Sequence, residues 1–358
     1  MRKREDAGKR EAPIIAVPAI PAIAMRRVIM RARLTPIVPC RDPEKRRNHN
    51  CGTLFSTKTR NAGHWARMTE EEKDLTGRRF YKAEQEAVFE DERPHDTAQT
   101  QHPAYKLAFN DADFLLRDEL RPVRFQLELL KPEMLLEEAQ IGSTLVMYGS
   151  ARIPAPEDGE ALLKTATTPE RKAVVEKLVA KAKYYEEARK LARIASSCAV
   201  VEKGLRQFVV CSGGGPSIME AANRGAADAG AESVGLNIVL PHEQAPNPYV
   251  TPRLSFQFHY FALRKMHFLM RAKALAVFPG GFGTLDEFLE TLTLIQTGKM
   301  KPIPLLLYGK EYWSRIINFE AMAEEGVINF EDLDLFHWVE TADEGWEIIT
   351  DFYGLDCR

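Results

Sequence analysis

The chain of 358 residues is long enough for two domains, or for one large α/β domain with an extension. No run of uncharged apolar residues reaches the roughly 18 that a membrane helix needs, so we expect no membrane span. The net charge of -2 at pH 7 combines two unlike parts of the sequence. Residues 1–67 have a net charge of +11, from 16 basic and 5 acidic residues, whereas the remaining 291 residues have a net charge of -13.

Residues 1–67 are basic, lack periodicity and are interrupted by Pro, Asn and Gly, so we predict that they are disordered. Three accounts fit them: a nucleic-acid-binding or targeting tail, an artificial addition, or a start codon assigned too far upstream. We favour the third, because Met68 precedes an acidic run at 69–72 that is typical of a helix start. We therefore do not expect a nucleic-acid partner, whose binding through this tail would depend steeply on salt.

The cysteines are odd in number, widely scattered and without the spacing of a metal site. That usage is typical of a reducing cytosol, and we predict a cytoplasmic protein that holds no metal. The five positions are Cys40, Cys51, Cys198, Cys211 and Cys357.

Residues 68–140 are predicted to form a helical extension that packs on the following domain. Its strongest helix spans 111–130, where apolar residues recur at helical spacing. Pro122 is expected to kink or divide that helix, because proline lacks the backbone N–H and clashes with the preceding turn.

From Ile141 onward short apolar strands alternate with helices. This alternation predicts an α/β fold for residues 141–358, a doubly wound (Rossmann-like) parallel sheet preceded by the helical extension. In such a sheet, ligands bind beyond the carboxyl ends of the strands, at the switch in strand order. The expected strands are 143–148, 207–211, 233–239, 274–278 and 304–308, with a weaker one at 254–258. The expected helices are 171–199, 216–229, 260–271 and 285–297.

Three loops that directly follow predicted strands are rich in small residues: Gly149–Arg152, Ser212–Ser217 and Pro279–Thr284. Glycine lets backbone N–H groups approach a ligand closely, and a helix N-terminus favours an anion. Two such loops at one sheet edge therefore predict a nucleotide phosphate site. A single loop of this kind also arises for structural reasons, and neither the dinucleotide fingerprint nor the P-loop motif is present.

Thr284 and Glu287 have the spacing of a capping box, with Thr284 at the N-cap and Glu287 at N3. Spacing alone favours this structural role, although a first-turn carboxylate also lies beside any phosphate that the loop holds. Arg264 and Lys265 lie on the preceding predicted helix, where solvated cations near a helix C-terminus are the simpler interpretation.

Together these residues resemble the LOG (Lonely Guy) family, long mislabelled as lysine decarboxylases. Pro279–Glu287 matches the PGGxGTxxE signature of that family, and Arg264-Lys265 stands where the family has an RK pair. Gly149-Ser150 and Gly213–Gly215 match its first two strand-exit loops, in order. The resemblance covers roughly residues 141–313, about half of the chain.

The resemblance implies hydrolysis of the N-glycosidic bond of nucleoside 5′-monophosphates, such as AMP or cytokinin riboside monophosphates, to free base and ribose 5-phosphate. It implies no cofactor, and a homodimer or larger assembly with the active site near the subunit interface. Arg264 and Glu287 would be the catalytic pair, and Lys265 a supporting base. The phosphate would be held by Gly280, Gly281, Gly283 and Thr284, with support from Gly149, Ser150, Gly214 and Gly215. The alternative is a non-catalytic nucleotide or molybdenum-cofactor carrier on the same fold.

The implied chemistry is physically reasonable for these side chains. Breaking a ribosyl–base bond develops positive charge on the sugar, which a carboxylate such as Glu287 stabilises while it deprotonates water. Arg264 would fix the phosphosugar or offset charge on the departing base. Asp286 lies about 100° further round the helix, so Glu287 is favoured over it. Many family members line the base site with a methionine where this chain has Phe261, so a general purine nucleotidase is as well supported as a cytokinin enzyme.

Overall fold

Seven strands form one sheet in the order β6-β5-β4-β1-β7-β8-β9, and every neighbouring pair is parallel. The computed structural model describes residues 80, 82–91, 97–241 and 245–357, so the predictions for 1–67 and Met68 lie outside it. The strands are β1 Thr144–Tyr148, β4 Val209–Ser212, β5 Val234–Ile238, β6 Ser255–Phe258, β7 Ala272–Val277, β8 Leu305–Tyr308 and β9 His337–Val339. The predicted strands are therefore present, including the weaker one, and of the seven strands of this sheet only β9 was missed.

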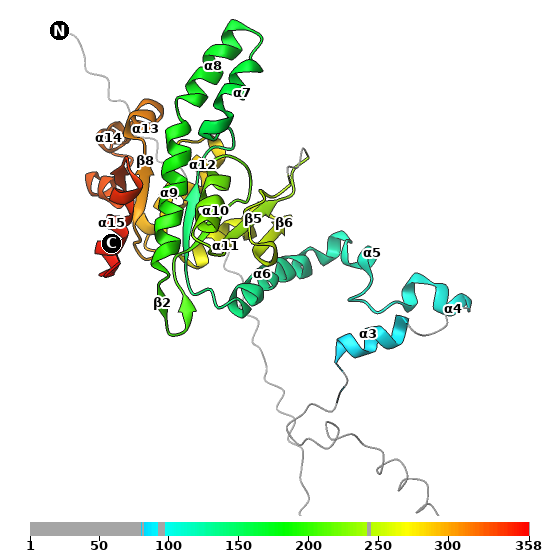
Figure 1. Cartoon of the computed structure of the whole chain (residues 1–358). Coiled ribbons are helices and arrows are strands. Elements are labelled where there is room, and N and C mark those ends of the chain that lie inside the picture. The colour runs from blue at the N-terminus through cyan, green and yellow to red at the C-terminus, as the bar shows by residue number, and fades with distance from the viewer. Residues whose placement is uncertain (1–79, 81, 92–96, 242–244, 358) are drawn as a thin grey trace, which may run out of the picture. The chain divides into compact units, whose positions relative to one another are not determined.

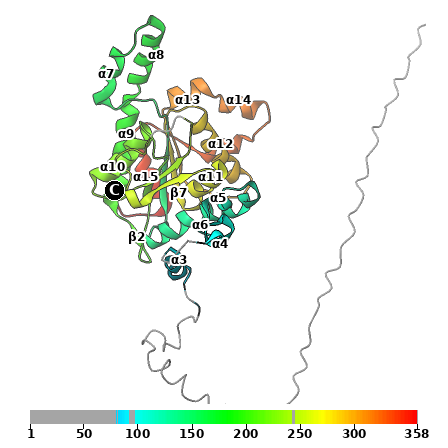
Figure 2. The same cartoon turned by 90° about the vertical axis from the view of Figure 1, so that its right-hand side faces the viewer.

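Helices cover both faces of the sheet, which confirms the doubly wound α/β fold (Figure 1). One face carries α9 Ala182–Cys198, α10 Ile218–Asp228 and α15 Ala342–Tyr353. The other carries α11 Phe261–Met270, α12 Phe282–Gln296, α13 Lys310–Ile316 and α14 Phe319–Glu324. Figure 2 shows α9 and α10 on one side of the sheet and α11 and α12 on the other.

Alternation along the central strand builds the two cores. In β1, Leu145 and Met147 belong to the core under α9 and α10, whereas Val146 and Tyr148 belong to the core under α11 and α12. All five residues of β1 are buried, because successive side chains of a strand point to opposite faces and both faces are covered.

The switch in strand order lies between β1 and β7. These strands are neighbours, but the chain continues from β1 towards β4 on one side and from β7 to β8 on the other. The loops that follow them are joined by a hydrogen bond from the Ser150 N–H to the Pro279 carbonyl, 3.1 Å long. Two of the glycine-rich loops thus meet at the place where α/β sheets bind ligands.

The described part of the extension contains α3 Ala83–Asp91, α4 Ala98–Gln101, η1 Pro103–Tyr105, α5 Ala112–Leu115, η2 Asp118–Leu120 and α6 Arg121–Glu138. The predicted helix at 111–130 is therefore divided next to Pro122, which occupies the first turn of α6, where proline costs no hydrogen bond.

Helix α6 supports the start of α11. The Glu128 carboxylate accepts hydrogen bonds from the N–H groups of His259 and Tyr260, at 2.9 and 3.2 Å. Further along the same pair of helices, Arg271 forms an ion pair of 3.0 Å with Glu133. The extension thus holds the helix that carries Arg264 and Lys265.

The predicted helix at 171–199 is also divided, into α8 Pro169–Val179 and α9. Together with α7 Gly159–Lys164, α8 extends away from the sheet (Figures 1 and 2). The remaining elements are a small antiparallel pair, β2 Val201–Glu202 with β3 Leu205–Arg206, and the short 3₁₀ helices η3 Pro156–Asp158, η4 Pro252–Leu254 and η5 Phe330–Leu335.

The structure joins Cys198 at the end of α9 to Cys357 in a disulfide, whereas Cys211 is free and buried. The sequence did not indicate this pairing, because only folding brings together two positions 159 residues apart in the sequence. The cytoplasmic location stays a prediction. None of the described helices is long and apolar enough to cross a membrane.

Candidate active site

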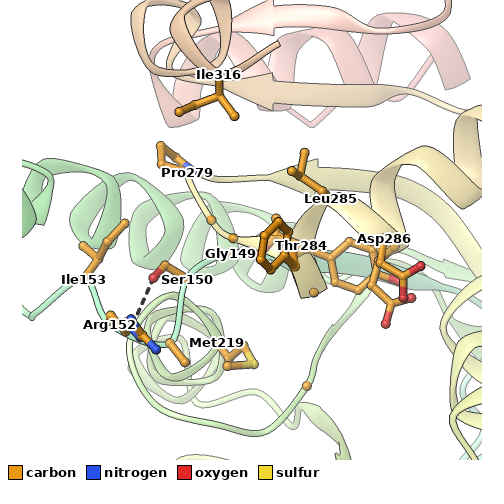
Figure 3. Close-up of a pocket in the computed structure, with 18 of the residues that line it drawn as sticks. Gly149, Ser150, Arg152, Ile153, Met219, Pro279, Thr284, Leu285, Asp286 and Ile316 are labelled. Carbon is orange, nitrogen blue, oxygen red and sulfur yellow. Dashed lines mark hydrogen bonds between the residues drawn. The ribbon is translucent and has the colours of Figure 1, made fainter.

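A pocket of ≈ 770 Å³ opens at the carboxyl ends of β1 and β7 (Figure 3). Figure 3 shows Ser150 and Arg152 on one wall, Thr284 and Leu285 on another, and Ile316 and Met219 at opposite edges. The predicted site residues that line it are Gly149, Ser150, Arg264, Gly280, Gly281, Gly283, Thr284 and Glu287. The lining residues do not include Lys265, Gly214 or Gly215. From the loop at 212–217, only Gly213 lines the pocket.

The N-terminus of α12 forms the wall on which a phosphate was expected. Helix α12 begins at Phe282, its N-cap is Gly281, and no side chain caps it. The capping-box prediction is therefore wrong: Thr284 is the third residue of the helix, and Glu287 lies in its second turn. Because the first N–H groups of a helix lack partners within the helix, this uncapped end can accept an anion.

Gly280 is fixed in place by its neighbours. A Cβ atom at this position would overlap the Thr284 side chain, so only glycine allows the loop to run this close to α12. The Tyr312 hydroxyl donates a hydrogen bond of 2.7 Å to the Gly280 carbonyl and holds the loop from the other side. The backbone of the loop is thus positioned before any ligand arrives.

Arg264 and Glu287 meet at one end of the pocket. Their side chains lie on α11 and α12, and 3.7 Å separates Arg264 Nη1 from Glu287 Oε1. Arg264 Nε donates a hydrogen bond of 2.7 Å to the Leu236 carbonyl, and the guanidinium lies over the Phe268 ring. A Cβ at Gly213 would lie only 2.7 Å from Arg264 Nη2, so glycine there leaves room for the guanidinium.

The environment of Glu287 suits proton transfer near neutral pH. Burial raises the pKa of Glu287 to about 7, against the lowering effect of Arg264 and Lys265. Burial also lowers the pKa of Arg264, while the Glu287 carboxylate opposes that shift. A carboxyl group whose pKa lies near the working pH is well matched to general base catalysis.

Lys265 contacts the exposed side of α12 rather than the pocket. Its Nζ forms ion pairs with Asp286 at 2.8 Å and Glu290 at 3.0 Å. Burial lowers the pKa of Lys265, but hydrogen bonds to these two carboxylates outweigh it and the pKa is raised. Lys265 therefore acts on the site only through charge: it lowers the pKa of Glu287 and compensates two negative charges that would raise it.

Two cations of the pocket wall were not predicted as site residues. Arg152 follows the Gly149-Ser150 loop, and Lys181 stands between α8 and α9 with its Nζ donating 2.8 Å to the Lys177 carbonyl. Neither forms an ion pair with a carboxylate in the part of the chain that the structure describes, unlike Arg264 and Lys265. Arg152 could have been predicted as a site residue, because it follows the first glycine-rich loop in the sequence. Lys181 could not, because it falls inside the helix predicted at 171–199.

Several apolar and aromatic side chains complete the lining. Phe261 and Phe282 are exposed, by 52% and 93%, and offer flat apolar surface at the pocket. The others that sequence reasoning did not assign to the site are Tyr148, Ile153, Leu178, Met219, Phe268, Leu285, Tyr312 and Ile316.

A sequence model of a family described as "Possible lysine decarboxylase" matches residues 219–349. Among curated relatives, a probable cytokinin riboside 5′-monophosphate phosphoribohydrolase of Oryza sativa subsp. japonica is 27% identical over 139 residues, covering 38% of this chain and 59% of the relative. The cytokinin riboside 5′-monophosphate phosphoribohydrolase LOG of the same organism is 30% identical over 132 residues, covering 36% of this chain and 52% of the relative. The chain thus spans little more than half of the length of these relatives.

A bacterial relative, the pyrimidine/purine nucleotide 5′-monophosphate nucleosidase of Escherichia coli (strain K12), is 32% identical over 116 residues, covering 30% of this chain and 25% of the relative. Among solved structures, the molybdenum cofactor carrier protein of Chlamydomonas reinhardtii is 15% identical with a TM-score of 0.35, covering 59% of this chain and 99% of that chain. A likeness that weak supports no conclusion about function. The sequence matches confirm the resemblance to the LOG family over residues 219–349, the segment that carries Arg264 and Glu287.

Proposed function

We propose that the protein hydrolyses the N-glycosidic bond of purine-type nucleoside 5′-monophosphates and releases the free base and ribose 5-phosphate. One observation carries this proposal: the buried pair of Arg264 and Glu287 borders a pocket whose wall is the uncapped N-terminus of α12. A helix end suited to an anion and a carboxylate suited to proton transfer thus border one cavity. The sequence relatives include a probable cytokinin riboside 5′-monophosphate phosphoribohydrolase and a pyrimidine/purine nucleotide 5′-monophosphate nucleosidase, so AMP and cytokinin riboside 5′-monophosphate are the substrates to test.

The 5′-phosphate would lie against the backbone of Gly280, Gly281, Gly283 and Thr284. A phosphate monoester carries about -1.5 to -2 charges at neutral pH and needs compensating donors. The helix end supplies N–H groups, and Arg152 and Lys181 supply positive charge that no described carboxylate neutralises. Because most of this chain is acidic, local donors and not the overall field would hold the phosphate.

In the reaction itself, Glu287 would deprotonate the attacking water and stabilise the positive charge that develops on the ribose. Arg264, fixed by the Leu236 carbonyl, would bind the phosphosugar or the departing base. Phe261 and Phe282 would contribute apolar surface for a flat base, because aromatic side chains pack well against such rings. The assembly of two or more copies that the resemblance implies stays a prediction.

The test is to incubate the protein with AMP, GMP, CMP and isopentenyladenosine 5′-monophosphate and to measure free base and ribose 5-phosphate. Adenosine, which lacks the phosphate, is the control substrate. We expect both products from the purine nucleotides and little base from adenosine. No release from any nucleotide would overturn the enzymatic function, and tight nucleotide binding without release would favour the carrier alternative.

A further inference from the structure

Helix α6 is apolar on two opposite sides, although only one of them packs against the rest of the domain. On the packed side, Leu136 is 3% exposed and belongs to the core under α11 and α12, and Leu129 contacts that core. The other side carries four apolar residues that are each between 38% and 56% exposed, which we call the α6 stripe: Val123, Leu127, Leu130 and Met134. A helix that is apolar all round is normally buried, so we expect a second surface to cover this stripe.

The geometry of the helix separates the two sides. Positions two residues apart lie about 200° apart around a helix axis, so Leu127 lies nearly opposite Leu129 and Met134 nearly opposite Leu136. The contacts that hold α6 on α11 start from the packed side, where the Glu128 carboxylate accepts hydrogen bonds from the N–H groups that precede α11. The α6 stripe is therefore not a part of the contact with α11 that happens to remain open.

The spacing of the α6 stripe is that of a contact between two helices. Its residues follow one another at intervals of four, three and four positions. This is the heptad spacing by which two helices pack along a common seam. The stripe extends for about 16 Å along the helix, because each residue adds about 1.5 Å. A second helix of similar spacing therefore fits it.

The charges at the two ends of α6 indicate that the second helix is another copy of α6. Arg121 at the start and Glu137 and Glu138 at the end are exposed, and the described part of the chain offers none of them an ion pair. If Leu127 of one copy packs on Leu130 of another in antiparallel orientation, Arg121 of each copy lies within one turn of the acidic end of the other. A parallel pair would bring like charges together instead, and antiparallel helix dipoles also attract.

We propose that a second copy of this chain docks on the α6 stripe, with the two α6 helices packed antiparallel around a two-fold axis. Such a contact uses the same surface on both copies and closes with two of them. No residue of the stripe lines the pocket, so the inference does not depend on the proposed function. It also adds an interface to the one near the active site that the family resemblance implies.

The first experiment measures the mass of the full-length wild type and of Leu127→Glu by sedimentation equilibrium. Leu127 is half exposed in the single chain, so the variant should fold, and circular dichroism should show unchanged helix content. We expect the mass of the assembly to fall by half and the dissociation constant of this contact to rise about 100-fold, because a two-fold interface loses each leucine twice. The matched control Val174→Glu, at an exposed apolar position on α8, should keep the wild-type mass.

The second experiment tests the antiparallel orientation by charge reversal. Arg121→Glu should weaken the association about fivefold at low salt, since exposed ion pairs are individually weak and are screened by salt. Adding Glu137→Arg and Glu138→Arg to the same chain should restore the association, because antiparallel packing again places opposite charges beside each other. In a parallel pair the triple variant would keep like charges together and would not recover.

Each result supports or overturns the inference. A wild type that remains a single chain, or an assembly whose mass Leu127→Glu leaves unchanged, would show that something other than a second copy covers the α6 stripe. Equal dissociation by Leu127→Glu and Val174→Glu would remove any special role of the stripe. A triple charge variant that stays as weak as Arg121→Glu would refute the antiparallel arrangement. None of these outcomes depends on whether the protein releases base from AMP, which tests the proposed function separately.

Discussion

The two faces of the central sheet bury different chemistry. The side chains that α9, α10 and α15 bury are uncharged: most are apolar or aromatic, and Asn223 and Thr350 are neutral polar groups. On the opposite face, α11 and α12 carry His267 and Glu287, the two acid–base side chains among the buried polar residues that the structure describes, together with the largely buried Arg264. Burying uncharged side chains stabilises the folded state more than burying charged ones, because buried charges lose their hydration. The burial of ionisable side chains on one face, next to a pocket, therefore indicates a site maintained for function.

The comparison is tested most strongly by Glu287→Gln, set against Glu187→Gln on the opposite face. We expect Glu287→Gln to lower kcat for AMP by about 10² to 10⁴, the usual range for loss of a general base. Glu187 accepts a 2.6 Å hydrogen bond from the N–H of Ala342 at the start of α15, so Glu187→Gln should reduce stability and leave kcat unchanged. Steady-state kinetics and thermal melts of both variants provide the measurement. Equal loss of activity in the two would contradict a special role for the α11/α12 face.

Arg264→Lys should have the next largest effect, a loss in kcat/KM of about 10²-fold. A lysine cannot both donate to the Leu236 carbonyl and remain beside Glu287, because it lacks the forked donor geometry of the guanidinium. Arg189→Lys is the control, since Arg189 pairs with Asp228 on the opposite face. Kinetics with AMP should show wild-type activity for the control, and an active Arg264→Lys enzyme would argue against a guanidinium-specific role.

Lys181→Met should raise KM for AMP about tenfold and change kcat much less. Burial and the positive charges of Arg315 and Lys177 lower the pKa of Lys181, which an approaching phosphate would counteract. A charge-assisted hydrogen bond of this kind is worth roughly 1.5–3 kcal/mol. Lys183 is an exposed lysine in the first turn of α9, and Lys183→Met should behave as the wild type. An unchanged KM in Lys181→Met would remove Lys181 from the phosphate site.

The pH dependence should give the smallest effect, about a tenfold rise in kcat/KM between pH 6 and 8. The active form of Glu287 as a base is the carboxylate, and its pKa is raised to about 7, so activity increases as this group ionises. Stability should change in the opposite direction, because a raised pKa favours the folded state at low pH and that contribution is lost as pH rises through 7. Both dependences should disappear in Glu287→Gln; an activity profile that is flat in the wild type would contradict the assigned role.

The sequence was sufficient for six of the seven strands of the sheet and for the glycine-rich loops, because buried strands and loop glycines depend on local patterns. It predicted Arg264 and Glu287 only through the family resemblance, since two residues on different helices meet through packing that no local pattern encodes. The start of α12 was placed too late, because Phe282 and Gly283 read as loop residues. The α6 stripe contributed to the apolar spacing that predicted a helix over 111–130, and its exposure became visible only when the surroundings of α6 were known.

The most direct measurement counts products formed from AMP by the wild type and by Glu287→Gln. We expect the wild type to release adenine and ribose 5-phosphate in equal amounts, and Glu287→Gln to release almost none while it still binds ribose 5-phosphate. Absence of adenine from the wild-type reaction, or full activity in Glu287→Gln, would contradict the central claim that the buried pair of Arg264 and Glu287 cleaves the glycosidic bond.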